Sequence, residues 1–340
     1  MLAYKICGHT FHSNTPIPEL VPGDERPPEF TFQLRAGTKN FPKSGPWLNQ
    51  WYALDGSVWL AFAKLEGGYL LSFPKLANFV VSADARAVCG YRRASCPPET
   101  MRHLLLNQVI PIVLSHLGKL VLHASACATR PGVIAFMGKT GSGKSTLAAS
   151  FGLRGLTVLT DDCLLVEEQA GVSMTVPSYP GLRLWPETVA ALFEQKPVLQ
   201  PLAHYTDKKR LFFDQERIDG PLPLKAMYVL SQPERQQDTT GVSISPLAAS
   251  EALLETVKHT FQLDVTHRQK LGQTFRQYER LVRSVPFFRL DFPRDHALLP
   301  AVNQAILNHL DSSPKSGHRT ADYLGQPAVE KKYVNQPRYS

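Results

Sequence analysis

This sequence has few cysteines, with no CxxC spacing among them, and no long apolar run. Its cysteines are odd in number and include no CxxC pair, which argues against a disulfide framework and a zinc site; the five are Cys7, Cys89, Cys96, Cys127 and Cys163. No run approaches the roughly 18 apolar residues that a membrane-spanning helix needs. The opening MLAYKICGHTFHSNTP has no apolar stretch of signal-peptide length. We therefore expect a cytoplasmic protein with no membrane partner.

Acidic residues are outnumbered: 29 Asp and Glu face 37 Lys and Arg, a formal net charge of +8. Residues 312–340 supply +3 of this, with five Lys or Arg and two Asp or Glu. A basic surface can simply keep a protein soluble. The excess positive charge outside residues 312–340 also suits a phosphate-binding site or an acidic peptide partner. Aromatic–basic interleaving and recognised nucleic-acid motifs are absent, so we expect no nucleic-acid partner.

The 340 residues, 43% of them hydrophobic, predict about two domains and a tail. Residues 1–97 hold short apolar or alternating runs separated by Pro, Gly and Asn, which predicts a small, mostly β N-terminal domain. Residues 98–311 are predicted to form the catalytic domain. It begins with a helix over 101–117, which Pro111 is expected to kink. Residues 312–340 lack periodicity and are rich in Pro, Ser, Gly, Lys and Asn, which predicts a disordered tail.

Strand and helix patterns alternate through the predicted catalytic domain. This order implies an α/β core with a nucleotide-binding loop at the carboxyl end of a strand. The predicted strands are 120–128, 133–137, 156–160, 227–231 and 287–292, and the predicted helices are 144–153, 249–260, 267–285 and 296–310.

A complete P-loop motif, GxxxxGK[ST], lies between the apolar run VIAFM and the helix-forming run TLAASFGL. Its glycines let successive backbone N–H groups turn toward phosphates, and a helix N-terminus adds donors. The motif assigns Lys144 to the β- and γ-phosphates and the Ser145 hydroxyl to magnesium. The predicted nucleotide-binding residues are Gly138, Lys139, Thr140, Gly141, Ser142, Gly143, Lys144, Ser145 and Thr146.

Two adjacent carboxylates, Asp161 and Asp162, end the predicted strand 156–160. A carboxylate at this place holds magnesium in P-loop proteins. Neighbouring side chains on a strand point to opposite faces, so one carboxylate can hold the metal while the other accepts a proton from an incoming hydroxyl. A kinase needs both tasks.

Several segments together resemble the kinase domain of HPr kinase/phosphorylase, a fold related to the ATP-dependent phosphoenolpyruvate carboxykinases. They are LHASA at 122–126, GKTGSGKST at 138–146, TVLTDD at 157–162 and PSYPGLRLWPETV at 177–189. Over about residues 1–310 the pattern is most similar to the stand-alone HPr-kinase-related enzymes of lasso-peptide biosynthesis, which phosphorylate a peptide serine. YKICGHTFHSNTPIPEL near the start, DKKRLFF at 207–213 and VPFFRLDFP at 285–293 also fit.

The resemblance implies roles for individual residues. Asp161 would be the general base, Asp162 would lie at the magnesium, and His123 would tune the base or approach the γ-phosphate. Arg183 would stabilise charge on the transferring phosphoryl group. Taken alone, however, His123 on an apolar strand is typical of a core histidine, and Arg183 beside Trp185 is equally typical of a surface arginine. The cations at 208–210 fit either a phosphate cover or a grip on an acidic peptide, and at least one of them is more typical of a solvated charge run.

The sequence therefore predicts an ATP- and Mg²⁺-dependent kinase that acts on a serine of a peptide or small protein, such as a lasso-peptide precursor. Two alternatives stay open: a kinase for a sugar or amino acid, and a nucleotide-gated binding module that needs no base. The phosphorylated substrate, a nucleotide other than ATP and a homo-oligomeric state also stay open.

Overall fold

Two compact units make up the described part of the computed structural model. The first contains residues 1–121, 202–206 and 260–277, and the second contains the remaining described residues. The predicted tail, apart from Ser312, lies outside the described residues. The structure describes residues 1–24, 26–35, 41, 46–53, 55–130, 132–195, 197–231 and 241–312.

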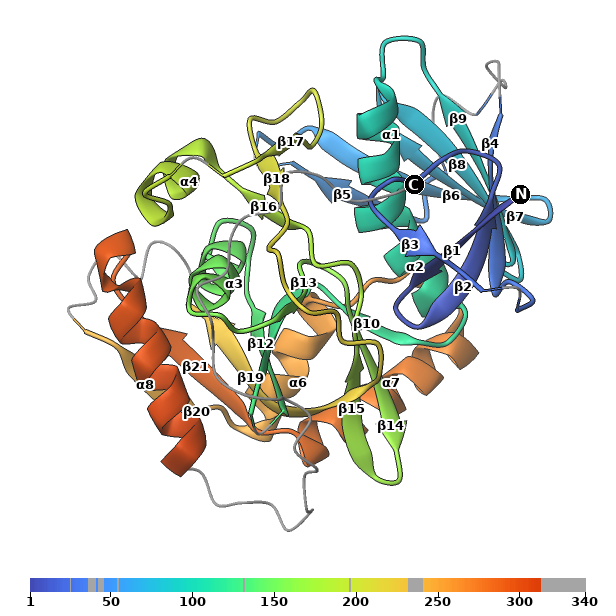
Figure 1. Cartoon of the computed structure of the whole chain (residues 1–340). Helices are drawn as coiled ribbons and strands as arrows, with labels where there is room; N and C mark the ends of the chain where they lie inside the picture. The colour runs from blue at the N-terminus through green and yellow to red at the C-terminus, as the bar shows by residue number, and fades with distance from the viewer. Residues whose placement is uncertain are drawn as a thin grey trace. The chain divides into compact units, whose positions relative to one another are not determined.

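The first unit is built on a nine-stranded sheet, drawn in blue to cyan in Figure 1. Its order is β3-β1-β2-β4-β9-β8-β7-β6-β5. Neighbouring strands are antiparallel except for the parallel pairs β2–β4 and β4–β9. The predicted β-rich N-terminal region is confirmed. The strands are β1 (Leu2–Ile6), β2 (His9–Ser13), β3 (Val21–Pro22), β4 (Phe30–Arg35), β5 (Asn49–Tyr52), β6 (Val58–Leu65), β7 (Gly68–Phe73), β8 (Ala77–Ser82) and β9 (Ala87–Arg92).

The helix predicted over 101–117 forms in three parts: α1 (Pro98–Leu104), a π-helical turn (Leu105–Val109) and α2 (Ile110–His116). In the wide turn the Ile110 N–H bonds to the Leu105 carbonyl. The turn lies just before Pro111, whose ring would crowd the preceding turn of a regular α-helix.

These helices belong to the first unit, so the boundary between the units falls after residue 121 and not after 97 as predicted. The physical reason lies in what the end of α2 contacts. The His116 ring packs edge-on against Tyr69 with centroids 5.1 Å apart, and its Nε2 lies 3.2 Å from the Ala83 carbonyl oxygen. The end of α2 is therefore held to the first unit by a ring contact and a hydrogen bond, which sequence periodicity could not show.

The second unit is mixed α/β, as predicted. Its central strands β12, β19 and β21 are parallel, and β11 pairs with both β12 and β13 in antiparallel register. On the other edge β14 pairs with β15, and β15 with β19. The strands are β11 (Ala124–Thr129), β12 (Gly132–Met137), β13 (Val158–Thr160), β14 (Leu164–Gln169), β15 (Val172–Val176), β19 (Leu222–Leu230), β20 (Ser243–Pro246) and β21 (Phe287–Asp291), with β10 (Leu120–Leu122) preceding them.

Helices and a small second sheet complete this unit. The small sheet has the order β16-β18-β17, and α3 contacts both β16 and α8. The helices are α3 (Lys144–Leu153), α4 (Pro186–Leu192), α6 (Ala249–Lys258), α7 (Arg268–Ser284, which begins in the first unit) and α8 (Leu299–Ser312). The small strands are β16 (Leu182–Leu184), β17 (Gln200–Pro201) and β18 (Lys209–Leu211).

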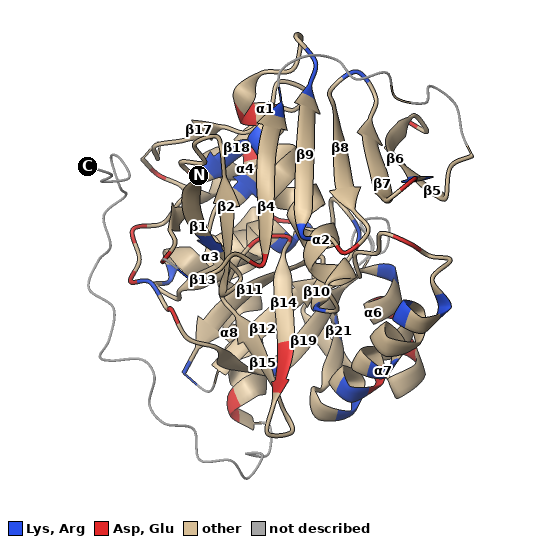
Figure 2. Cartoon of the chain, turned by 90° about the vertical axis from the view of Figure 1, so that its right-hand side faces the viewer, with Lys and Arg blue, Asp and Glu red and all other residues tan. Residues whose placement is uncertain are grey.

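Part of the positive charge of the chain lies along α7 (Figure 2). Its 17 residues, RQKLGQTFRQYERLVRS, include five Lys or Arg and a single Glu. The basic excess is therefore not confined to the neighbourhood of the glycine-rich motif. None of the helices within the described ranges combines the length and apolar character needed to cross a membrane.

The packing beneath α3 gives a stability prediction. Phe151 of α3 and Phe136 of β12 are fully buried and stack with ring centroids 5.6 Å apart. Because truncation of a buried Phe loses apolar burial and leaves a cavity, Phe151→Ala is expected to cost about 3–5 kcal/mol of unfolding free energy. The exposed Phe275 is the matched control, with Phe275→Ala expected to cost little. Urea unfolding measures both, and a loss below about 1 kcal/mol for Phe151→Ala would contradict the packing described.

Candidate active site

The glycine-rich loop, defined as Gly138–Ser145, connects the carboxyl end of β12 to α3. Gly138 and Gly143 have φ angles of 152° and 97°, which side chains rarely adopt. A Cβ on Gly138 would also lie 2.7 Å from the Ser142 Oγ and 3.1 Å from the Leu230 carbonyl oxygen. Both glycines are therefore needed for the backbone conformation of the loop that leads into the N-terminus of α3.

Lys144 folds back over this loop and is nearly buried. Its Nζ donates hydrogen bonds to the carbonyl oxygens of Gly138, at 2.8 Å, and Lys139, at 3.2 Å. Burial is the main cause that lowers the pKa of Lys144 to about 8; Asp161 opposes this shift, whereas Arg183 and Lys208 add to it. The ammonium group is thus held by backbone dipoles in a partly dehydrated place.

The outer part of the loop is exposed at Lys139, Thr140 and Gly141, whereas Thr146 is half-buried in the first turn of α3. The Arg294 Nη2 donates a 2.9 Å hydrogen bond to the Gly141 carbonyl oxygen. Sequence reasoning gave Arg294 no role, because 153 residues separate it from Gly141 and no motif connects the two.

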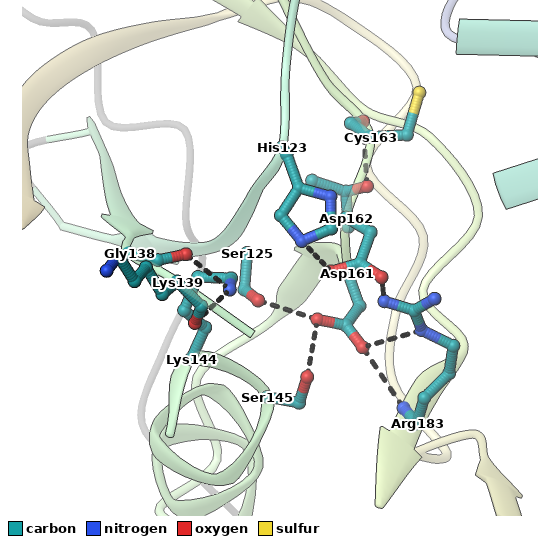
Figure 3. A network of polar contacts seen from close by, with 11 residues as sticks. His123, Ser125, Gly138, Lys139, Lys144, Ser145, Asp161, Asp162, Cys163 and Arg183 are labelled. Carbon is teal, nitrogen blue, oxygen red and sulfur yellow. Dashed lines mark hydrogen bonds and ion pairs between the residues drawn. The ribbon is translucent and has the colours of Figure 1, made fainter. Parts of the chain in front are cut away.

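Asp161 lies at the centre of the polar network in Figure 3 and is buried. Its Oδ1 accepts hydrogen bonds from the hydroxyls of Ser125, at 2.6 Å, and Ser145, at 2.9 Å. Its Oδ2 accepts one from the Arg183 backbone N–H, at 3.1 Å, and approaches the Arg183 Nε, at 3.5 Å. Asp161 therefore joins the glycine-rich loop to β11 and β16.

Asp162, also buried, turns away from the glycine-rich loop. Its Oδ1 lies 3.3 Å from the His123 Nε2, and its Oδ2 forms an ion pair with the Arg183 Nη2. The backbone of Asp162 is left-handed, with φ 72°, a conformation that Asp tolerates better than most residues. The two carboxylates point in different directions, as the sequence predicted. The cause, however, is the left-handed backbone of Asp162 just after the end of β13, and not the alternation of side chains along a strand.

His123 interrupts the strand predicted over 120–128, so that β10 ends before it and β11 begins after it. Its backbone N–H donates a 2.7 Å hydrogen bond to the His259 carbonyl oxygen. Burial, followed by the charges of Lys144 and Arg183, holds the pKa of His123 well below its usual range. The imidazole is therefore neutral at neutral pH and does not form a charged pair with Asp162 there.

Arg183 is only 12% exposed and contacts both aspartates. It lies on β16 opposite Arg210 of β18. Of the two readings that the sequence left open, the surface arginine is wrong, because the guanidinium faces the carboxylates. What role it has toward a substrate stays a prediction.

Ser125, like Arg294, was given no role from the sequence. It lies two positions after His123 within LHASA, and side chains two apart on an extended segment share a face. That spacing could have placed its hydroxyl beside the same carboxylate pair. Of the three cations for which the sequence left a phosphate cover or a grip on an acidic peptide open, Arg210 is buried, and Lys208 and Lys209 are half-buried.

A hard cation would find two oxygen donors here, the Ser145 hydroxyl and the Asp161 carboxylate, 2.9 Å apart. Within the described ranges, no group of three or more His, Cys, Asp or Glu side chains could hold a metal ion. This donor set fits magnesium, which is typically held by one or two protein oxygens together with substrate phosphates.

Comparisons with known proteins carry no argument about the fold or the function of this chain. Neither the protein-family models nor the curated proteins contain a match to this chain. Among solved structures, the chain is similar to the Hpr(Ser) kinase/phosphatase from Coxiella burnetii, with 12% sequence identity and a TM-score of 0.28. The likeness covers 56% of this chain and 95% of that one. The functional interpretation therefore rests on the site residues.

Proposed function

We propose that this chain is an ATP- and Mg²⁺-dependent kinase that phosphorylates a serine hydroxyl of a peptide or small protein, such as a lasso-peptide precursor. One observation carries the proposal: Asp161 is hydrogen-bonded both to Ser145 of the glycine-rich loop and to Arg183, with a second buried carboxylate beside it. A nucleotide-binding module needs the loop, whereas phosphoryl transfer to a hydroxyl also needs a group that accepts the hydroxyl proton, and the second carboxylate can supply it.

Nucleotide binding in this proposal uses the loop and its lysine. The backbone amides of the glycine-rich loop and the N-terminus of α3 supply hydrogen-bond donors to phosphates. Lys144, already held over the loop by the carbonyls of Gly138 and Lys139, supplies a positive charge to the β- and γ-phosphates. Asp161 and Ser145 would hold magnesium, which when bound neutralises phosphate charge.

Asp162 is the better placed general base. The carboxylate that shares a metal with Ser145 has to lie beside its hydroxyl, and that carboxylate is Asp161. Asp162 contacts His123 and the Arg183 guanidinium, and none of the contacts described for it joins it to Ser145. This distribution reverses the one predicted from the sequence, in which Asp161 was the base and Asp162 the metal ligand.

His123 and Arg183 would position the base and stabilise the charge that develops during transfer. His123 orients the Asp162 carboxylate through the 3.3 Å contact, and a neutral imidazole leaves the carboxylate able to accept the serine proton. The Arg183 guanidinium lies against both carboxylates and, once phosphates are bound, would stabilise negative charge on the transferring phosphoryl group. Transfer then proceeds in line from the nucleotide to the serine oxygen.

The lowered pKa of Lys144 predicts proton uptake on nucleotide binding. Phosphates favour the charged amine, so the pKa of Lys144 rises in the complex. Affinity should therefore be full below pH 8 and fall as the pH rises above about 8, by up to about tenfold per unit. Calorimetry at pH 9 in buffers of different ionisation enthalpy measures the uptake. The Lys144→Arg variant, which stays charged, should lack it; wild-type binding without proton uptake would contradict the assignment.

Phosphoryl transfer itself is tested with γ-labelled ATP, Mg²⁺ and a serine-containing peptide, with a Ser→Ala peptide as the control. We expect label on the serine and none on the control peptide. Label appearing on a sugar or amino acid, but never on peptides, would replace this proposal with the small-molecule kinase. Nucleotide binding without any labelled acceptor would favour the binding module.

A further inference from the structure

The ladder between β16 and β18 places Trp185 opposite Lys208. In this antiparallel pair Arg183 lies opposite Arg210 and Leu184 opposite Lys209. Continuing the register by one residue pairs Trp185 with Lys208. Directly opposite side chains share a face, as do side chains two apart on one strand. The Lys208 Nζ lies 5.1 Å from the centre of the Trp185 ring, in agreement with that pairing.

This face of the small sheet is the one that carries Arg183, whose guanidinium contacts Asp161 and Asp162. Lys208 is therefore on the side of the candidate active site. Its electrostatic environment agrees: burial lowers the pKa of Lys208 most, Arg183 lowers it further, and Asp161 raises it. Lys208 in turn lowers the pKa of Lys144.

Lys208 is thus within electrostatic reach of both the lysine assigned to the phosphates and the aspartate assigned to the metal. The place between those two residues is where the terminal phosphate of a bound triphosphate would lie. A cation–π contact with Trp185, which is 42% exposed, restrains the long side chain without neutralising its charge. A cation restrained in this way can bind one additional phosphate group of the nucleotide.

We propose that Lys208, held against Trp185, binds the terminal phosphoryl group of the nucleotide and so distinguishes a triphosphate from a diphosphate. This inference rests on the proposed nucleotide-binding function and adds a specificity-determining residue to it. A diphosphate lacks the group that Lys208 contacts, so the product is released more readily than the substrate.

Lys208→Met tests this by removing the charge while keeping most of the side-chain length. Lys209→Met is the matched control, since Lys209 is next in the chain but lies opposite Leu184 on the other face of the ladder. Calorimetry with Mg²⁺ gives the affinities for ADP and for a non-hydrolysable ATP analogue. Lys208→Met should weaken analogue binding about 10- to 100-fold, as for loss of a charge-assisted hydrogen bond. ADP affinity should change less than about twofold, and Lys209→Met should change neither.

Tryptophan fluorescence gives a second measurement, and its signal should not change on nucleotide binding if Lys208 has only a structural role. The analogue should draw the ammonium group away from the Trp185 ring and change its emission, whereas ADP should not. The change should disappear in Trp185→Phe, which leaves the other three tryptophans in place.

Three results would overturn the proposal. Equal weakening of ADP and analogue binding in Lys208→Met would make Lys208 a general electrostatic or structural residue. Unchanged binding of both, with a raised KM for an acidic peptide, would assign Lys208 to the peptide. Failure of the folded wild-type protein to bind either nucleotide would instead remove the proposed function on which this inference rests.

Discussion

Replacement of Asp162 by Asn is expected to lower phosphotransfer by about 10²–10⁴ while nucleotide binding stays nearly intact. An amide keeps the size and shape of the carboxylate but cannot accept the serine proton. Asn also tolerates the left-handed backbone of this position, so the fold should survive the substitution. The measurement is phosphopeptide formation together with nucleotide affinity by calorimetry in the presence of Mg²⁺.

Asp161→Asn is the matched comparison, because it makes the same chemical change one residue away. Asp161 lies beside Ser145, so this variant should lose Mg²⁺-dependent nucleotide affinity. The opposite pattern, with binding lost in Asp162→Asn and only turnover lost in Asp161→Asn, would restore the roles predicted from the sequence. Unchanged phosphotransfer in Asp162→Asn would end the assignment of the base.

Removal of the Lys144 ammonium should lower turnover at least about 10²-fold, as does loss of one preorganised charge-stabilising donor. Lys144 is held by two carbonyls of the glycine-rich loop, so its charge is in place before the nucleotide arrives. Lys144→Ala loses both this charge and the tie across the loop. Steady-state assays of peptide phosphorylation measure the effect.

Lys64→Ala is a suitable control for Lys144→Ala, since it removes the same charge from an exposed position on β6 in the first unit. We expect it to leave turnover unchanged. Near-normal turnover in a folded Lys144→Ala protein would refute the assignment of Gly138–Ser145 as a phosphate-binding loop. Circular dichroism and thermal unfolding establish that the variant is folded.

The glycine-rich loop was predictable because its chemistry is local. The motif, the apolar run before it and the helix-forming run after it lie within about 20 consecutive residues, and each has its own pattern. The mixed α/β core followed from the same alternation of strands and helices. In the first unit the individual strands were harder to predict than the β-rich character of the region; in β2, for example, His9 and His12 interrupt the apolar pattern of a short strand.

The geometry around the two aspartates could not be predicted in the same way. The identity of the carboxylate beside Ser145 depends on the backbone of Asp162, which leaves the extended conformation at one residue. The contacts of Arg183 and Arg294 join segments that are 22 and 153 residues from their partners. Sequence spacing carries no signal at that separation, and only the fold brings these side chains together.

The stoichiometry of the reaction tests the kinase proposal most directly. ADP and phosphoserine are measured in the same samples after mixing the protein with ATP, Mg²⁺ and the serine peptide. A peptide kinase forms one phosphoserine for each ADP, and we expect ADP formation to fall sharply when the peptide serine is replaced by Ala. Equal ADP formation with and without the serine, and no phosphoserine, would show that water is the acceptor and would contradict a peptide kinase.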